Sequence, residues 1–128
     1  MPARLDHTIV RSRDRFAAAR FLTELIGEPE PRPFGPFASV PLANGVTLDY
    51  LDDEGDIVSQ HLAFLVAEDE FDEIFGRIVK GELPYWADPY HRTPQEINHL
   101  HGGRGVYLED PDGHSIEFIT HTYVTESS

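Results

Sequence analysis

The stretch Asn44-Gly45-Val46-Thr47-Leu48-Asp49-Tyr50-Leu51 decides the fold, because it returns 68 positions later as Asp112-Gly113-His114-Ser115-Ile116-Glu117-Phe118-Ile119. Each copy places an Asn-Gly or Asp-Gly pair before a run of alternating residues, which is the pattern of a strand leaving a tight turn. A carboxylate occupies the same place in both runs. The chain is therefore predicted to contain two similar units that each close with an acidic strand.

The first part of each unit repeats at a shorter offset of 54 positions. The matching pairs are His7 with His61, Phe21 with Phe75, and Gly27 with Gly81. Each histidine opens a strand-like segment, and each glycine stands where a helix is expected to end. Each unit thus opens with a histidine and closes with a carboxylate, which suggests a site built where two similar units meet.

Strand-like and helix-like segments alternate between these landmarks. A helix is expected over residues 16–26 behind the N-cap Asp14, and a second where apolar residues recur at helical spacing from Phe71 to Val79. Strand-like runs occupy residues 5–10, 38–42, 46–51, 60–66, 104–109 and 114–120. The prediction is an α+β fold in a single domain over residues 1–128, with module 1 at about 4–53 and module 2 at about 59–122.

The second module is longer than the first, because the offset grows from 54 to 68 within residues 83–103. This loop combines aromatic residues, prolines and three histidines. Long loops on a rigid scaffold often bind ligands, although many merely vary in sequence. His91, His99 and His101 are open to two interpretations, a separate metal patch or a solvated loop, and His114 is interpreted as a surface turn residue.

Composition excludes several classes of protein. The 128 residues suffice for one domain with a real core, and the absence of cysteine removes disulfides, thiolate metal sites and thiol nucleophiles. A formal net charge of -13 argues against nucleic acid as a partner. Because no long apolar run or signal sequence is found, we expect a soluble, cytoplasmic protein without a membrane partner.

The repeated ligand-type residues point to a metal site. Two histidines and one carboxylate form a facial triad with open positions, which is associated with non-haem Fe(II) and also suits Mn, Ni, Co or Zn. His7, His61 and Glu117 are the predicted ligands, because each has an equivalent in the other module. Asp49, the equivalent of Glu117, is open to several interpretations: a fourth ligand, a hydrogen-bond acceptor near the metal, a general base, or a solvent-facing acid.

The chain resembles the vicinal oxygen chelate superfamily, which includes glyoxalases, fosfomycin-resistance enzymes, extradiol dioxygenases and bleomycin-binding proteins. The resemblance covers nearly the whole chain and is carried by Asp6-His7-Thr8, by Gln60-His61-Leu62-Ala63-Phe64 and by residues 107–117. Residues 46–51, 83–89 and 96–99 look like a bacterial branch that includes the aromatic-ring-cleaving dioxygenase of chartreusin biosynthesis.

This resemblance implies two tandem βαβββ modules that form a cupped mixed sheet around one divalent metal. It also implies a homodimer that exchanges halves, so that His7 of one chain joins His61 and Glu117 of the other. Glyoxalase-type members have a carboxylate at the position of Asp49, whereas fosfomycin enzymes use three protein ligands. The aspartate here falls between the two patterns.

The choice among reactions depends on the pocket. Few cations stand near the predicted loop, which argues against anionic substrates such as fosfomycin and glutathione, whereas its aromatic residues suit stacking on a flat ring or ordinary packing. The leading interpretation is a metal-dependent dioxygenase, an oxidoreductase of antibiotic biosynthesis acting on an aromatic, polyketide-type small molecule. Dioxygen, or a peroxide supplied by a reduced flavin, is the expected oxidant. Residues expected to contact the substrate or move protons are Tyr85, Trp86, Asn98, His99, His101, Arg104 and Tyr107.

Two other functions remain open on sequence grounds. A glyoxalase-type lyase or isomerase would use the same metal without consuming oxygen. An antibiotic-binding resistance protein would trap a planar drug without turnover, but such proteins typically lack the metal ligands. Oxygen uptake and metal content are the measurements that separate these readings.

Overall fold

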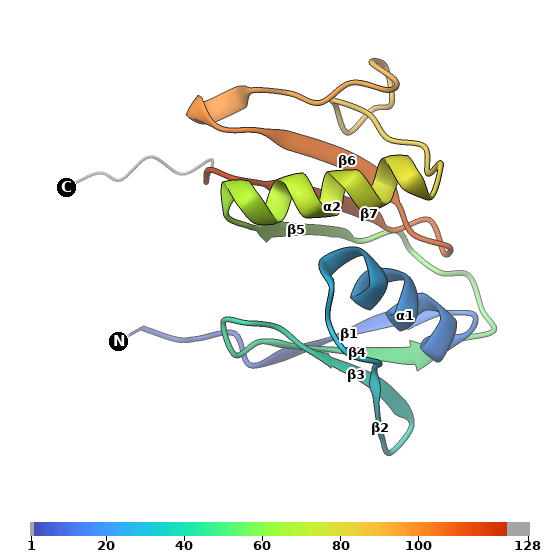
Figure 1. Cartoon of the computed structure of the whole chain (residues 1–128). Coiled ribbons are helices and arrows are strands. Elements are labelled where there is room, and N and C mark those ends of the chain that lie inside the picture. The colour runs from blue at the N-terminus through green and yellow to red at the C-terminus, as the bar shows by residue number, and fades with distance from the viewer. Residues whose placement is uncertain (1, 123–128) are drawn as a thin grey trace. The chain divides into compact units, whose positions relative to one another are not determined.

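The protein is described by a computed structural model for residues 2–122, and it divides into two compact units, residues 1–58 and 59–128. The first unit contains β1 (His7–Ser12), α1 (Arg15–Ile26), β2 (Arg32–Phe34), β3 (Phe37–Pro41) and β4 (Thr47–Asp52) (Figure 1). The second unit contains β5 (His61–Leu65), α2 (Glu68–Lys80), the 3-10 turn η1 (Leu100–Gly102), β6 (Gly105–Glu109) and β7 (Ser115–Ile119).

The first unit forms a four-stranded mixed sheet in the order β1-β4-β3-β2, in which β1 runs parallel to β4. Helix α1 covers one face of this sheet. Asp14 caps the helix by accepting a hydrogen bond from the Ala17 N–H, and Gly27 ends it with a φ of 72°. Both predicted caps are therefore confirmed, because a short acidic side chain satisfies a free N–H and glycine tolerates positive φ.

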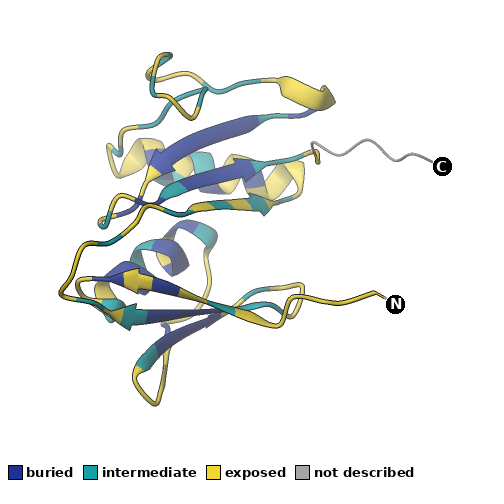
Figure 2. Ribbon diagram, turned by 180° about the vertical axis from the view of Figure 1, so that it is seen from behind, coloured by how far each residue is buried: buried dark blue, intermediate teal, exposed yellow. Residues whose placement is uncertain are grey.

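The second unit forms a three-stranded mixed sheet in the order β5-β7-β6, with β5 parallel to β7. Helix α2 buries Phe71, Ile74 and Ile78, which are spaced at one face of a helix. Val79, predicted on the same stripe, is half exposed at its edge. Buried residues lie along β3 and β4 in the first unit and along β6 and β7 in the second, and the connections are largely exposed (Figure 2).

The second unit departs from a regular βαβββ module. In place of its third strand along the chain, Trp86 alone pairs with Tyr107 through two backbone hydrogen bonds of 2.9 Å. Asn98 pairs with Gly105 in the same way at the start of β6. Three prolines in residues 84–94 explain the short pairing, because proline cannot donate to a ladder.

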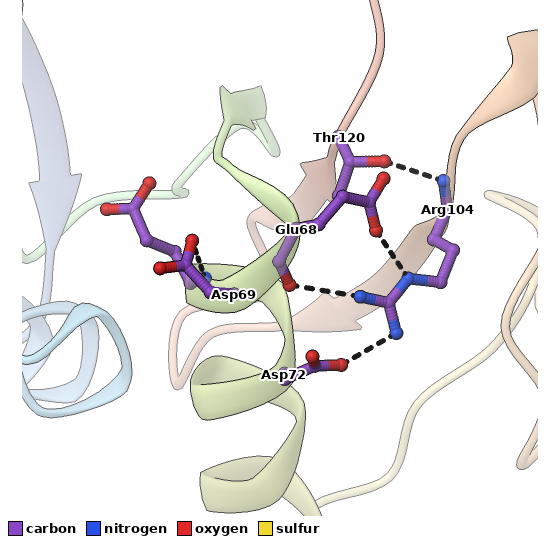
Figure 3. A network of polar contacts seen from close by, with 6 residues as sticks. Glu68, Asp69, Asp72, Arg104 and Thr120 are labelled. Atoms are coloured by element: carbon purple, nitrogen blue, oxygen red, sulfur yellow. Dashed lines mark hydrogen bonds and ion pairs between the residues drawn. The ribbon is translucent and has the colours of Figure 1, made fainter.

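A compact polar network joins the start of β6 to the first turns of α2 (Figure 3). The Arg104 guanidinium donates to the Glu68 and Asp72 carboxylates at 2.8 Å and to the Glu68 carbonyl at 3.0 Å. It also lies 4.5 Å from the centre of the Phe71 ring. These contacts raise the pKa of Arg104, first through the Asp72 hydrogen bond, and hold the helix against the sheet.

The predicted α+β class is confirmed, with two helices and two mixed sheets in the described part of the chain. The arrangement of both units in one cupped domain stays a prediction. Within residues 2–122, no helix combines the length and the apolar character that a membrane span requires.

Candidate metal-binding site

Glu117 stands at the centre of a row of residues that runs across the second sheet. Backbone pairing sets Glu117 opposite Ala63 on β5 and opposite Tyr107 on β6, and sets Tyr107 opposite Trp86. Directly opposed residues point to the same face of a sheet, so these four side chains share the face away from the buried Phe118. The row places a carboxylate, a phenol and an indole side by side.

The Glu117 carboxylate is fully buried and only half satisfied. Its Oε1 lies 2.8 Å from Nε2 of His61, which is about half exposed. Its Oε2 is buried without a hydrogen-bond partner among the described residues. Because an unpartnered buried carboxylate oxygen is costly, this atom fits a cation as its missing partner, and an imidazole beside a carboxylate is a donor set that divalent metals accept.

Tyr107 is the neighbour of Glu117 in this row. Burial raises the pKa of the Tyr107 hydroxyl, and a hydrogen bond to the Glu117 carboxylate raises it further. The phenol therefore stays protonated throughout the neutral range and acts as a donor. Its ring meets the His61 ring edge to face, with centroids 6.0 Å apart.

The first unit carries an equivalent row. Asp49 on β4 lies opposite Ile9 on β1 and Ser39 on β3, and Ser39 lies opposite Arg32 on β2. The Ser39 hydroxyl donates to Oδ1 of Asp49 at 2.5 Å, and Asp49 is only 6% exposed. The interpretation of Asp49 as a solvent-facing acid is therefore wrong, because its side chain is buried and engaged by the Ser39 hydroxyl.

His7 lies at the start of β1 on the same face as Asp49. Its Nδ1 is 2.8 Å from Oδ2 of Asp6, and this hydrogen bond is the main reason why the pKa of His7 is raised. The contact engages one ring nitrogen and leaves Nε2 as the atom through which His7 would ligate. A carboxylate on the far nitrogen is a common support for a metal-bound histidine.

His7 and Asp49 line a cavity of about 610 Å³ that belongs wholly to the first unit. Its wall also includes the aromatic rings of Phe34 and Phe37 and the side chain of Arg32. The volume falls within the range typical of small-molecule sites, and its mixed polar and apolar lining suits a flat ligand that bears oxygen atoms.

Within residues 2–122, no three His, Asp or Glu side chains gather as a metal-binding group. His91, His99 and His101 lie within one unit and do not form such a group. The interpretation of these three histidines as a metal patch is therefore wrong. The predicted triad is a different case. His7 belongs to the first unit and His61 with Glu117 to the second, so the triad stays a prediction.

Trp86, at the end of the Glu117 row, stacks on His91, with ring centroids 3.6 Å apart and planes 5° apart. Nδ1 of His91 lies 3.6 Å from the Glu109 carboxylate. Asp88 shapes the loop between them. Although desolvation opposes it, hydrogen bonds from the backbone N–H groups of Thr93 and its neighbours hold the pKa of Asp88 below its usual value.

Several of the predicted substrate residues make contacts within the second unit, and their role toward a substrate stays a prediction. Tyr85 packs edge to face against Phe75 of α2, on the helix side of the sheet. Asn98 donates to the Ala87 carbonyl at 2.9 Å and accepts from the Leu100 N–H, so its amide holds the loop together. The guanidinium of Arg104 is engaged by α2, as described above. His99 and His101 are exposed around η1.

His114 supports the candidate site from the interior, and its prediction as a surface residue is wrong. It is fully buried, not a surface turn residue, and its Nδ1 accepts a hydrogen bond from the Gln60 N–H at 2.9 Å. The Ser115 N–H donates to the Gln60 carbonyl at 2.8 Å. These bonds fix the residue before His61 to the strand that carries Glu117, which aligns the two candidate ligands.

Arg32 was also missed, although the repeat contained a signal for it. The register makes Arg32 the equivalent of Trp86, at the offset of 54 that relates the first parts of the two modules. Ser39 and Tyr107 are likewise equivalent, at the offset of 68. The longer loop therefore enters after Trp86, and each carboxylate has a hydroxyl neighbour in its row.

Known proteins share this architecture along the whole chain. Oxidase ChaP-H1 is 53% identical, with 97% of this chain and all of that chain covered and a TM-score of 0.94. Oxidase ChaP-H2 is 54% identical, with 99% and 100% covered and a TM-score of 0.94. The fosfomycin resistance protein FosX from Mesorhizobium loti has the same fold at 21% identity, with 96% of each chain covered and a TM-score of 0.70.

The chain belongs to the vicinal oxygen chelate superfamily. It is an enzyme of that superfamily. The metallothiol transferase FosB of Lysinibacillus sphaericus (strain C3-41) is 34% identical over 62 residues, which span 48% of this chain and 39% of that protein. No family profile matches the sequence. Enzymes of this superfamily use a divalent metal, which agrees with the buried Glu117 carboxylate and its one oxygen without a partner among the described residues.

Proposed function

We propose that the protein is a divalent-metal-dependent oxygenase that acts on an aromatic substrate chelated through two neighbouring oxygens. The observation that carries the proposal is the buried Glu117, whose Oε1 meets His61 while Oε2 has no partner in the described residues. Near-complete alignment with two proteins named as oxidases supports this reaction class over others in the superfamily.

In this proposal His7, His61 and Glu117 hold the metal, with Fe(II) favoured by the two-histidine, one-carboxylate set. The metal supplies Lewis acidity that lowers the pKa of a phenolic oxygen and steadies the charge that develops on the ring. Dioxygen, or a peroxide from a reduced flavin, supplies the oxidising equivalents. The substrate belongs to the polyketide-type aromatic compounds of antibiotic biosynthesis.

The protein's own side chains bind and orient the substrate and move its protons. Tyr107, protonated because burial raises its pKa, donates a hydrogen bond to Glu117 and helps to orient that carboxylate. Trp86 presents an indole in the same row, next to Tyr107, where a flat ring can stack. Asp49, held by Ser39, is placed to accept a phenolic proton on the His7 side or to ligate the metal as a fourth group.

His7 reaches the other two ligands in a homodimer that exchanges halves. Neighbouring copies would then supply His7 from one chain and the pair His61 and Glu117 from the other. Each chain carries both half-sites, so two equivalent sites form per dimer.

Metal content tests the ligand set. Protein purified without added metal is measured by elemental analysis beside His7→Ala, His61→Ala and Glu117→Ala, with the exposed His99→Ala as the matched control. We expect about one divalent metal per chain in the wild type and in the control, and a loss of at least tenfold in affinity for each ligand variant. Equal metal in all five proteins would contradict the proposal.

Mixing tests the shared site. Two inactive chains, His7→Ala and Glu117→Ala, are combined and allowed to exchange subunits. One intact site per mixed dimer should restore part of the metal content, because one interface receives only unaltered ligands. A mixture that holds no more metal than its separate components would place the site within one chain.

Oxygen uptake separates the proposed reaction from a glyoxalase-type isomerisation, the second candidate. Asp49 favours that alternative, because it provides a buried carboxylate equivalent to Glu117 and could complete a four-ligand site. Substrate turnover without oxygen consumption, by the Fe(II)-loaded and flavin-supplemented protein, would replace the oxygenase assignment with the isomerase.

A further inference from the structure

Arg32 brings a positive charge to the wall of the His7 cavity. It opens β2 and lies opposite Ser39, which in turn lies opposite Asp49 and donates to it. Because opposed residues share a face, Arg32 stands two strands from Asp49 on the cavity side of the sheet. It lines the cavity of about 610 Å³ together with His7.

The guanidinium of Arg32 is uncommitted in a strongly acidic protein. Of the lysines and arginines in residues 2–122, Arg32 alone lines this cavity, and no carboxylate in that range forms an ion pair with it. By contrast, Arg15 pairs with Asp52 and Arg20 with Glu30. The two acids of the cavity wall are already engaged, Asp6 by His7 and Asp49 by Ser39.

Aromatic surfaces flank this charge. Phe34 follows Arg32 on the same short strand and is 67% exposed, and Phe37 lies opposite Phe34. Both rings line the cavity. An exposed phenylalanine beside an unpaired guanidinium offers apolar area for a flat ring and a planar fork that matches a carboxylate. Together these features describe a subsite for an aromatic acid.

The second unit has no cation at the position equivalent to Arg32. Arg32 corresponds to Trp86, so the duplicated rows end in a cation in one unit and in an indole in the other. The carboxylate neighbours, Ser39 and Tyr107, keep the same hydrogen-bonding role. The two rows therefore differ in charge at Arg32 and Trp86, each of which lies two strands from the carboxylate of its row. At that distance a side chain would recognise a group of the substrate rather than the metal.

We propose that Arg32 recognises a carboxylate, or an equally acidic oxygen, on the aromatic substrate. The proposal rests on the proposed function and names its substrate class as a planar aromatic acid. A net charge of -13 repels anions from the protein at large, so binding an acidic substrate requires a local cation. Arg32 supplies that cation on the wall that carries His7.

The test compares a probe acid with its neutral twin. The chelating pair 3-hydroxy-2-naphthoate and 3-hydroxy-2-naphthamide differ in charge but hardly in size. Their dissociation constants are measured by titration calorimetry on Mn²⁺-loaded wild type, Arg32→Gln and Lys80→Gln. Lys80 is exposed on α2 outside the cavity, so its variant changes the net charge equally.

We expect the wild type to prefer the acid, and Arg32→Gln to lose about tenfold or more of that preference while its affinity for the amide stays within twofold. Lys80→Gln should keep the preference. Arg32→Lys should recover part of it, because the charge remains and the bidentate fork does not. Circular dichroism checks that each variant is folded.

Three results would overturn the assignment: no binding of the acid by the wild type, no preference for it, or a preference that survives Arg32→Gln. Metal content separates this failure from failure of the proposed function. A wild type that binds metal but treats both probes alike refutes only the role of Arg32. A wild type without metal refutes the metal site, while the comparison of the two probes still decides the role of Arg32.

Discussion

Replacing His114 by alanine should both destabilise the protein and weaken metal binding at the proposed site. The imidazole is fully buried, and its Nδ1 accepts the Gln60 N–H at 2.9 Å. Truncation leaves that backbone N–H without its acceptor and opens a cavity beneath the β6–β7 turn. The unmet donor and the lost packing together cost about 2–4 kcal/mol.

The effect on the site follows from the position of this hydrogen bond. Gln60 directly precedes His61, and His114 stands three residues before Glu117. Loosening the connection lets the two proposed ligands drift apart, and supporting residues of this kind typically change metal affinity by about tenfold to a hundredfold. His114→Asn is the informative companion, because its Oδ1 can replace Nδ1 as the acceptor and should recover part of both losses.

Urea unfolding and Mn²⁺ titration measure the two effects on the same samples. With a slope of about 2 kcal/mol/M, His114→Ala should shift the unfolding midpoint by about 1–2 M. His101→Ala, which removes an exposed histidine from η1, should leave both readings near the wild type. A His114→Ala protein as stable as the wild type, or an asparagine variant no better than alanine, would refute the reasoning.

Three further predictions concern the groups around the two rows. Arg104→Ala should lower the free energy of unfolding by about 1 kcal/mol, mainly through the lost contact with Phe71 and one backbone hydrogen bond; an unchanged urea midpoint would contradict this. Ser39→Ala should cost about 1–3 kcal/mol, because it removes the donor to the buried Asp49, and thermal unfolding of Ser39→Thr, which keeps a hydroxyl, is the control. Burial raises the pKa of Asp110, so the folded state holds that proton more tightly than the unfolded state. The resulting stability is complete below the unfolded pKa, near pH 4, and is lost as pH rises through the folded pKa. Asp110→Asn should remove this dependence when the free energy of unfolding is measured between pH 3 and 7. A wild-type curve parallel to that of the variant would disprove the prediction.

The elements were predictable because their signals are local. Asp14 and Gly27 mark the ends of α1 through chemistry that acts within a few residues. The Asn44-Gly45 turn fixes the pairing of β3 with β4 in the same way. The third strand of the second module was not predictable, because the pairing of Trp86 depends on how a long loop returns to β6.

The side-chain roles in the loop were harder to foresee for the same reason. Tyr85 and Trp86 are neighbours in sequence and both aromatic, yet a paired backbone sends them to opposite faces, toward α2 and toward the Glu117 row. Arg104 was predicted from the sequence to lie near the substrate, and the structure shows that its guanidinium binds the first turns of α2. Composition identifies such residues as candidates, but only pairing tells which face each one occupies.

The sequence by itself determined the repeat, the two caps and the identity of the ligand candidates, because each rests on residue type at a fixed spacing. Tertiary structure decided which of the candidate side chains are buried and which of their polar atoms have hydrogen-bond partners. It buries Glu117 with one oxygen that has no partner within residues 2–122, buries Asp49 against Ser39, and shows that His114 lies in the interior and supports the candidate site. It also brings Arg32 into the row of Asp49. The physical reason is that burial and register are properties of strands brought together from distant parts of the chain, and no local spacing encodes them.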